Sequence, residues 1–600
     1  MAITRRNFVT NAALAAAAAG FASPAAFAQT AADGPAKALR QLFIDSDETN
    51  LKLNPLSGLF RGDMRYADQF GDYLSEAYYK QSEANSRSEL KRLLAIPRAQ
   101  LGPVDKIAYD VFKYQTEFGL KAFDTGIVQI QRQLPIDHFT GVHTFFPDLQ
   151  SGQSAAPYKT VADYENGLKR CDGFITFLDE AQKLMAQGIR DGHVQPKVVS
   201  QNVIEQLQTI TKLPLEDSPY YLPIKALPAD FSDADKARLT AAYRATIADK
   251  LMPAYRRLEK FMVETYLPAS RSERPGLASM KDGVKIYQYL IESHTTTQMT
   301  ADEIHKLGLA EVARITAEMN ATKDQVGFKG DLKAFFTHLR DDPKFKFESK
   351  DALLTAYRGV EAKVLKRIPE LFALTPKSPL EIRPVPEFLE KNQAGAYYQQ
   401  GTPDGSRPGV FYVNTYDLPS RTSFGMETLF LHEAIPGHHF QISLAQENTS
   451  LPPFMRFGGN TAYVEGWALY AESIGKELGM FGDPYQYFGR LDDEMLRAMR
   501  LVVDTGLHAK GWTREQGIQY FLDNSAQSET DARAEVERYI AIPGQALAYK
   551  IGQLTITRLR AEATKRLGDT FDIKGFHAEV LNTGALPMQV LEAKIRAWKA

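Results

Sequence analysis

Cysteine is nearly absent from this 600-residue sequence, and its scarcity excludes several kinds of structure. The only cysteine, Cys171, cannot form an intrachain disulfide and cannot supply the ligand pairs of a cysteine-rich zinc site. We expect it to be a small buried hydrophobe. An excess of charge of one sign is also missing, because 71 basic residues balance 73 acidic ones without a long run of either. The composition therefore indicates neither nucleic acid nor a charged membrane surface as a partner.

Long apolar runs are missing after the first 28 residues. None approaches the roughly 18 residues of a membrane span, so we expect no stable membrane insertion of the mature chain. Within the first 28 residues, Arg5 and Arg6 form a twin-arginine signature, followed by an alanine-rich segment and the small-x-small pattern Ala26-Phe27-Ala28. This pattern is typical of a signal for the twin-arginine (Tat) route, cleaved after Ala28, and predicts a periplasmic protein. A membrane anchor is the alternative, which the short apolar segment disfavours.

Helical periodicity dominates the rest of the chain. Residues 29–36 are small and polar and are predicted to be a disordered lead-in. From residue 37 onward, apolar residues recur at steps of three and four, as in residues 74–94, 158–189, 233–267, 301–319, 461–478 and 492–510. Ser232 is a candidate N-cap, and Thr300 with Glu303 forms a capping box. We expect one helical catalytic domain over residues 37–600, in one lobe or in two that divide near residue 290.

The helical pattern is interrupted between residues 380 and 414. Short alternating runs of Pro, Gly, Tyr and β-branched residues predict a small β-sheet there, with a turn at Pro403-Asp404-Gly405-Ser406. The last of these runs, residues 410–413, comes shortly before a histidine-rich segment. As an edge strand it could hold an extended peptide by main-chain hydrogen bonds, and a purely structural hairpin is the alternative.

Three of the 11 histidines lie within residues 431–440, LHEAIPGHHF. Burying His and Glu together costs several kcal/mol unless something compensates them, and a metal ion is a common partner. On an unbroken helix, the six-residue step from His432 to His438 turns about 240° and rises about 9 Å, which points the rings apart. Pro436 removes a backbone donor and Gly437 permits unusual dihedrals, so we predict a distortion that lets both rings share a metal. His439 is the alternative ligand, and a solvated polar helix end is the alternative to a metal site.

A third ligand is expected from residues 461–472, TAYVEGWALYAE. Glu465 lies in a nearly unbroken apolar and aromatic run, so its carboxylate needs a compensating partner. It follows His438 by 27 residues, which leaves room for one loop and a return along a second helix. Zinc sites with two His and one Glu take a ligand from such a position, and Glu472 could orient a ligating His. An internal ion pair with an arginine is the alternative for Glu465.

The strings HEAIPGHHFQ, AYVEGWALYAE, RLVVDTGLHAKGW, PGQALAYKIG and GALPMQVLE resemble the bacterial domain-of-unknown-function family 885 (DUF885). The resemblance covers nearly all of the mature chain. That family is similar to helical gluzincin zinc peptidases such as thimet oligopeptidase and neurolysin. Those peptidases use H-E-x-x-H, whereas here AIPG separates His-Glu from the next His; dipeptidyl peptidase III has one extra residue at this point. The resemblance implies a mainly α fold, a large multi-helix zincin-like catalytic unit with a small β-sheet next to the active-site helix.

The resemblance also implies a set of functional residues. His432, His438 and Glu465 would bind Zn²⁺, and Glu433 would take a proton from zinc-bound water as that water attacks a scissile carbonyl. Donors to the oxyanion are also needed. The candidates, each with a buried packing role as its alternative, are His508 and Tyr549.

We therefore expect a periplasmic zinc-dependent hydrolase, specifically a metallopeptidase that cleaves short peptides. The same water-activating residues would serve a zinc hydrolase of a non-peptide amide or ester, which is the first alternative. The second alternative is a non-catalytic periplasmic binding protein that has the fold without the metal.

Overall fold

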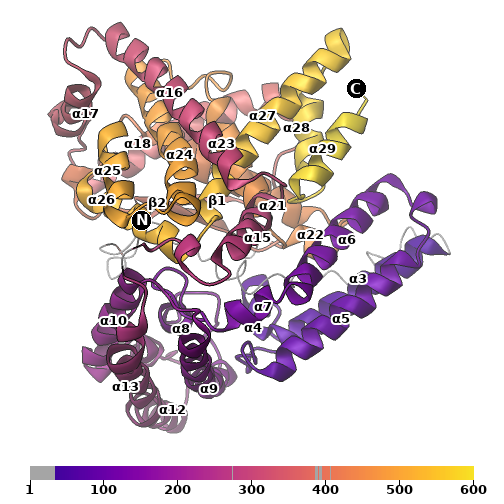
Figure 1. Ribbon diagram of the computed structural model, residues 1–600, viewed down its shortest axis with the longest axis vertical. Coiled ribbons are helices and arrows are strands. Elements are labelled where there is room, and N and C mark those ends of the chain that lie inside the picture. The colour runs from indigo at the N-terminus through magenta and orange to yellow at the C-terminus, as the bar shows by residue number, and fades with distance from the viewer. Residues whose placement is uncertain (1–33, 273, 386–389, 391–394, 406, 600) are drawn as a thin grey trace.

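The computed structural model describes residues 34–272, 274–385, 390, 395–405 and 407–599, and every structural statement below refers to these residues. The predicted signal sequence and residues 29–33 of the predicted lead-in lie outside them. The fold is mainly α with one small sheet, as predicted (Figure 1). No helix in the described ranges is both long enough and apolar enough to cross a bilayer.

The N-terminal part of the chain, as described from residue 34 onward, is built mainly from helices, and its first helix begins two residues before the predicted domain boundary. These helices are α3 (Pro35–Leu53), α4 (Pro55–Arg61), α5 (Glu76–Leu94), α6 (Pro103–Asp124), α7 (Ile127–Arg132), α8 (Val142–Leu149), α9 (Val161–Asp191), α10 (Lys197–Lys212), α11 (Leu222–Lys225), α12 (Asp233–Ala245), α13 (Met252–Phe261) and α14 (Leu267–Ala269). Ser232 caps α12 as predicted. Two π-helical segments, Thr246–Leu251 and Met262–Tyr266, join α12 to α13 and α13 to α14.

The remaining helices form the larger, upper part of the molecule in Figure 1. They are α15 (Gly283–Thr295), α16 (Ala301–Gln325), α17 (Leu332–Asp341), α18 (Lys350–Leu371), α20 (Met426–Glu433), α21 (His438–Glu447), α22 (Pro453–Arg456), α23 (Thr461–Ser473), α24 (Pro484–Lys510), α25 (Arg514–Asn524), α26 (Glu529–Ala541), α27 (Ala548–Leu567), α28 (Ile573–Leu581) and α29 (Met588–Ala597). The predicted capping box of Thr300 and Glu303 opens α16.

The apolar cores do not follow a division near residue 290. One core joins α4, α8, α9, α10, α12 and α13 around Phe146, Phe174 and Tyr255. Helices α3 and α6 belong instead to the main core of the C-terminal part, where the rings of Phe43 and Phe112 lie 4.9 and 5.4 Å from that of Phe454. The N-terminal helices are therefore shared between two cores.

Two pairs of long helices pack closely at glycines. At Gly308 of α16, a Cβ would lie 2.7 Å from Leu501 Cβ on α24. At Gly552 of α27, a Cβ would lie 1.8 Å from the carbonyl oxygen of Ala462 on α23. Gly466, on α23, faces the backbone of Gly552 in turn. Since neither side of this second contact has room for a side chain, α23 is held in backbone contact with α27.

The sheet has three strands, β1 (Leu380–Pro384), β2 (Ala396–Gln399) and β3 (Gly409–Val413), in the order β1-β3-β2. β1 runs parallel to β3 and β2 antiparallel to it. The prediction that residues 410–413 form an edge strand is wrong, because β1 pairs with β3 on the side away from β2. The predicted turn has Gly405 at φ 72° with its N–H bonded to Thr402, and Ser406 lies outside the described residues.

Candidate metal centre

The histidine-rich stretch consists of two helices rather than one distorted helix. α20 ends at Glu433, α21 begins at His438, and Ala434 (φ −110°, ψ −102°) leaves the helical region between them. A Cβ at Gly437 would lie 1.9 Å from the carbonyl oxygen of His432, so only glycine fits there. The turn is also held from outside, because the indole N–H of Trp467 donates to the carbonyl of Pro436 over 2.8 Å. The Ile435–Pro436 peptide bond in this turn is cis.

This turn brings the two histidine rings together. The ring centroids of His432 and His438 lie 4.7 Å apart with an interplanar angle of 82°. Oε2 of Glu465, on α23, is 3.3 Å from Nε2 of His438 and 3.8 Å from Nε2 of His432. One ligand atom from each of the three residues lies within 4.8 Å of the others, and all three side chains are buried.

The donor set fits a zinc ion. Two ligands that are each about 2.0–2.2 Å from a tetrahedral zinc are separated by about 3.3–3.6 Å, close to the spacings around Glu465. Two imidazoles and one carboxylate also leave one coordination position open, which is the arrangement of catalytic zinc sites. The three side chains come from the end of α20, the start of α21 and the first half of α23.

A second carboxylate orients the first histidine. Nδ1 of His432 lies 2.6 Å from Oε1 of Glu472, which is the orienting role predicted for this residue. Burial lowers the pKa of His432 to about 3, so the imidazole is neutral. Burial raises the pKa of Glu472 to about 7, and Arg497 opposes that rise from 4.0 Å away. With its Nδ1 proton donated to Glu472, His432 presents the lone pair of Nε2 toward Glu465.

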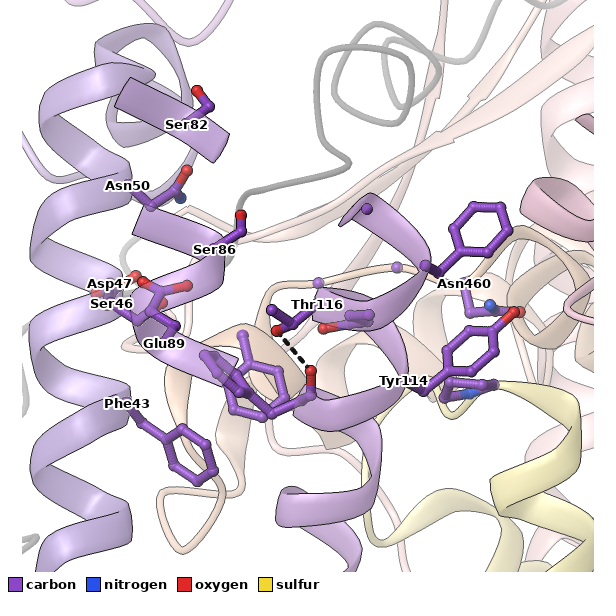
Figure 2. Close-up of a pocket in the computed structure, with 18 of the residues that line it drawn as sticks. Phe43, Ser46, Asp47, Asn50, Ser82, Ser86, Glu89, Tyr114, Thr116 and Asn460 are labelled. Atoms are coloured by element: carbon purple, nitrogen blue, oxygen red, sulfur yellow. Dashed lines mark hydrogen bonds between the residues drawn. The ribbon is translucent and has the colours of Figure 1, made fainter. Parts of the chain in front are cut away.

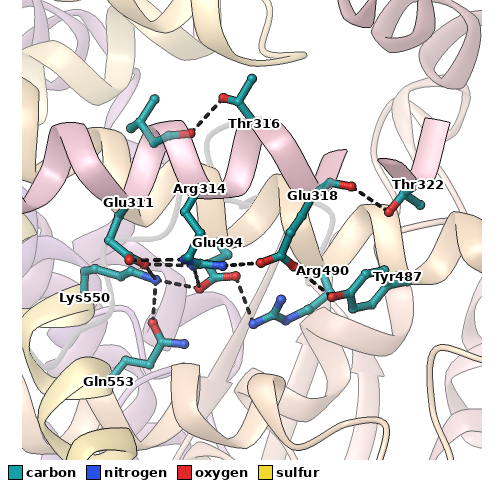
Figure 3. Close-up of polar contacts among 11 residues, drawn as sticks. Glu311, Arg314, Thr316, Glu318, Thr322, Tyr487, Arg490, Glu494, Lys550 and Gln553 are labelled. Atoms are coloured by element: carbon teal, nitrogen blue, oxygen red, sulfur yellow. Dashed lines mark hydrogen bonds and ion pairs between the residues drawn. The ribbon is translucent and has the colours of Figure 1, made fainter. Parts of the chain in front are cut away.

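A network of ions lies close enough to Glu472 to influence its pKa, and Figure 3 shows its members. Its centre is Glu494 of α24, which contacts Lys550 at 2.6 Å, Arg314 at 2.7 Å and Arg490 at 2.9 Å. Burial alone would raise the pKa of Glu494, but these cations lower it to about 2. Lys550 is completely buried and also contacts Glu311 at 2.9 Å. The network ties α16, α24 and α27 together.

Glu433 is buried at the C-terminal end of α20, beside the sheet. Its Oε2 accepts a hydrogen bond from the backbone N–H of Tyr398 over 2.9 Å. Tyr398 lies on β2, which is an edge strand of the sheet. The carboxylate of Glu433 is therefore fixed against the strand edge, one residue along the chain from His432.

His439 turns away from the three converging residues. Its Nδ1 lies 3.1 Å from the hydroxyl of Tyr398, and burial lowers its pKa to about 4. Of the two neighbouring histidines, the structure thus places His438 against Glu465.

His508 is buried on α24 with both ring nitrogens bonded to the backbone. Nδ1 accepts from the N–H of Leu277 over 3.1 Å, and Nε2 donates to the carbonyl of Tyr539 over 2.9 Å. Burial lowers its pKa to about 3. These contacts describe the packing role that was the alternative to an oxyanion donor.

Tyr549 lies at the start of α27 among arginines. Its hydroxyl accepts a hydrogen bond from Arg538 over 3.2 Å, and the guanidinium of Arg500 lies 4.5 Å above its ring. Arg500 in turn is paired with Glu535 at 3.0 Å. The phenol is therefore set in a polar, positively charged surrounding.

A cavity of about 170 Å³ lies beside Glu465. Strand β2, α21, the start of α23 and the end of α4 contribute to its wall. Its charged lining residues are Arg61, Arg407, Arg456 and Glu465. The candidate metal centre thus has an adjoining space in which a ligand could lie.

Comparisons with known proteins bear on the family and the fold. A profile of the family described as "Bacterial protein of unknown function (DUF885)" matches residues 55–595. A solved structure described as a "putative lipoprotein" from Colwellia psychrerythraea is 30% identical, with a TM-score of 0.87 over 94% of this chain and 99% of that one. A "putative lipoprotein of unknown function" from Shewanella oneidensis is 20% identical, with a TM-score of 0.71 over 96% and 99% of the two chains. No curated protein matches the chain.

Proposed function

Because the chain belongs to DUF885, a family of bacterial proteins of unknown function, we propose its activity from its site: a zinc-dependent hydrolase, specifically a metallopeptidase that cleaves short peptides. The observation that carries the proposal is the convergence of His432, His438 and Glu465 on one point. Two imidazoles and a carboxylate at these separations are a zinc ligand set, and Glu472 holds His432 in the ligating tautomer.

Glu433 is the general base in this proposal. Zinc, when bound, would polarise the scissile carbonyl and lower the pKa of a water molecule. Glu433 would accept the proton of that water and deliver it to the leaving amine. The N–H of Tyr398 fixes one oxygen of the Glu433 carboxylate, which keeps the base in place while the proton moves.

Tyr549 remains the candidate donor to the oxyanion. Its hydroxyl accepts a bond from Arg538 and can therefore direct its own proton elsewhere. His508 has no part in the proposed mechanism, because both of its ring nitrogens are bonded to the backbone.

The edge strand β2 favours a peptide over other amides or esters. In an antiparallel pair, alternate residues direct their N–H and C=O groups away from the partner strand. The N–H of Tyr398 points to Glu433 in this way, so the outward-facing backbone of β2 borders the candidate centre. An extended peptide could lie along such an edge and place its carbonyl beside the metal ligands.

We also infer that the protein is exported, by the Tat route to the periplasm. The twin-arginine signature of Arg5 and Arg6 supports this, as do two similar structures described as putative lipoproteins. A lipid attached through cysteine is not expected here, because Cys171 is the only cysteine and is buried.

Metal analysis of neighbouring histidine variants tests the proposal. Purified wild type and His439→Gln should each hold about one zinc per chain, whereas His438→Gln should lose it. Glu433→Gln should keep its zinc and lose cleavage of a mixed peptide library. If the wild-type protein does not hold about one zinc per chain, the proposal is refuted. If it holds zinc but does not cleave peptides in a Glu433-dependent way, a non-peptide amide or ester is favoured as the substrate.

A further inference from the structure

A second cavity, of about 180 Å³, lies between α3, α5, α6 and α15 (Figure 2). Figure 2 shows Ser46, Asp47 and Glu89 together on one side of it, and Tyr114 with Asn460 on the other. Two carboxylates line it, and no lysine or arginine does so among the described residues. The cavity is thus acidic and otherwise lined by hydroxyl, amide and aromatic groups.

The two carboxylates differ in how they are compensated. Asp47 lies 3.3 Å from Arg61, although burial still raises its pKa to about 8. Glu89 is half-buried and has a hydrogen bond from Ser46, and the cation that lowers its pKa, Arg92, is itself paired with Asp45 at 2.6 Å. Burial raises the pKa of Glu89 as well. The negative charge left to this cavity is therefore mainly that of Glu89.

His294 gives an independent sign that the cavity takes a ligand. Its side chain is 6% exposed and lines the cavity, and no hydrogen bond to another described residue satisfies either ring nitrogen. Burial lowers its pKa to about 4, so the ring is neutral and one nitrogen can accept a hydrogen bond. The hydroxyl of Tyr114 is also buried without a partner among the described residues. Buried polar groups of this kind are normally bonded to something.

The cavity adjoins the candidate metal centre. Residues 457–461 line both cavities and lead directly into α23, which carries Glu465. The two cavities carry opposite charge, because arginines line the one beside Glu465. One of these, Arg456, is bonded through its guanidinium to the carbonyl of Gln446 and has no carboxylate within 4 Å among the described residues.

We propose that the cavity between α3, α5, α6 and α15 binds the free ammonium group of the peptide, so that the enzyme selects substrates with an unblocked amino end. This inference rests on the proposed peptidase function. An ammonium group is a cation with three N–H donors, for which the carboxylate of Glu89 is the charged acceptor in this cavity. The neutral ring of His294 and the hydroxyl groups of the lining add further acceptors. A metal ion fits less well, since His432, His438 and Glu465 form the metal-like cluster of the described residues.

The test pairs a change in the peptide with a change in its proposed partner. A free-amine peptide and its N-acetylated form are compared on wild type, Glu89→Gln and the control Glu83→Gln. Glu83 is on the same helix but faces the surface, paired with Arg87. N-acetylation should raise KM about 10-fold or more in wild type and in Glu83→Gln, as expected for loss of a hydrogen bond between charged groups. Glu89→Gln should raise KM for the free-amine peptide alone and remove the difference between the two peptides.

Two further measurements test which ammonium group is bound and whether His294 takes part. An acetylated peptide with lysine as its first residue tests whether a side-chain ammonium is accepted in place of the terminal one. His294→Gln should weaken the preference for the free amine as well, provided that its thermal unfolding matches wild type. Equal KM values for the free and acetylated peptides in wild type would overturn the inference.

Binding to Glu433→Gln separates this inference from the proposed function. Titration calorimetry with the free-amine and acetylated peptides should show the same preference without any turnover. If wild type cleaves the free-amine and acetylated peptides equally well, the ammonium site is refuted and the peptidase proposal is not. If the free-amine peptide binds selectively but wild type cleaves neither peptide, the ammonium site is supported and the peptidase proposal is refuted.

Discussion

Gly552→Ala should be strongly destabilising although alanine is the better helix former. The substitution favours a helix by about 1 kcal/mol in general. Here the added Cβ would lie 1.8 Å from the carbonyl oxygen of Ala462, and ordinary contacts begin near 3.4 Å. α23 and α27 would have to separate by about 1.5 Å, since both contacting groups belong to the backbone. Overpacking of this kind costs about 1–3 kcal/mol, and a backbone clash belongs at the upper end.

The same substitution at Gly359 is the matched control. Gly359 is exposed on α18, and a Cβ there would meet nothing within 4 Å. Gly359→Ala should therefore stabilise the protein by about 0.5–1 kcal/mol. The urea concentration at the unfolding midpoint should be lowest for Gly552→Ala, intermediate for wild type and highest for Gly359→Ala.

Gly552→Ala should also weaken metal binding. Glu465 is next to Gly466, the residue of α23 that faces Gly552, and zinc ligand distances vary by only about 0.2 Å. A shift of α23 by more than 1 Å would carry Glu465 away from the two histidines. If Gly552→Ala were as stable as wild type and kept its zinc against the same chelator, the inferred backbone contact would be refuted.

Three further predictions follow from the surroundings of the site. Lys550→Met should cost about 3 kcal/mol in urea unfolding, because it leaves the buried carboxylate of Glu494 with fewer cations; an unchanged midpoint would contradict the network. Trp467→Phe removes the donor to the carbonyl of Pro436, which should destabilise the turn by about 1–2 kcal/mol. The variant should therefore lose zinc at a lower chelator concentration than wild type, and equal zinc retention would contradict this. The pKa of His508 is about 3 in the folded chain, below its ordinary value of 6.5, so the folded state binds fewer protons and stability should fall as pH decreases from 6.5. The slope is up to about 1.4 kcal/mol per pH unit, and unfolding of His508→Gln at pH 7 and 5.5 should show a shallower one.

The sequence predicted the composition of the candidate site better than its backbone. Helical geometry alone required a distortion between His432 and His438, and Pro436-Gly437 marked its place. The form of that distortion, a turn between two helices, depends in part on Trp467, about 30 residues away along the chain. The helix and turn propensities of the residues around Pro436 cannot predict that contact.

The errors and omissions have the same physical origin. β3 was predicted to be an edge strand because strand order depends on pairing with β1, which arrives from about 30 residues earlier in the chain. Nothing in the sequence around His508 indicates that backbone groups of Leu277 and Tyr539 bond to its two ring nitrogens. The acidic cavity was not predicted at all, since its wall is assembled from helices and loops that are far apart in the sequence.

The turn between α20 and α21 has a consequence for how such centres can vary among proteins. In a continuous helix, the repeat of 3.6 residues restricts two neighbouring ligands to a spacing of three or four. Where one helix ends just after the first candidate ligand, as α20 does after His432, and another begins on the next, as α21 does on His438, the intervening turn sets the spacing instead. Related centres could then gain or lose residues in this turn without changing the ligand geometry. A His-Glu pair at a helix end, followed by a His that starts the next helix, describes such centres better than a fixed residue count.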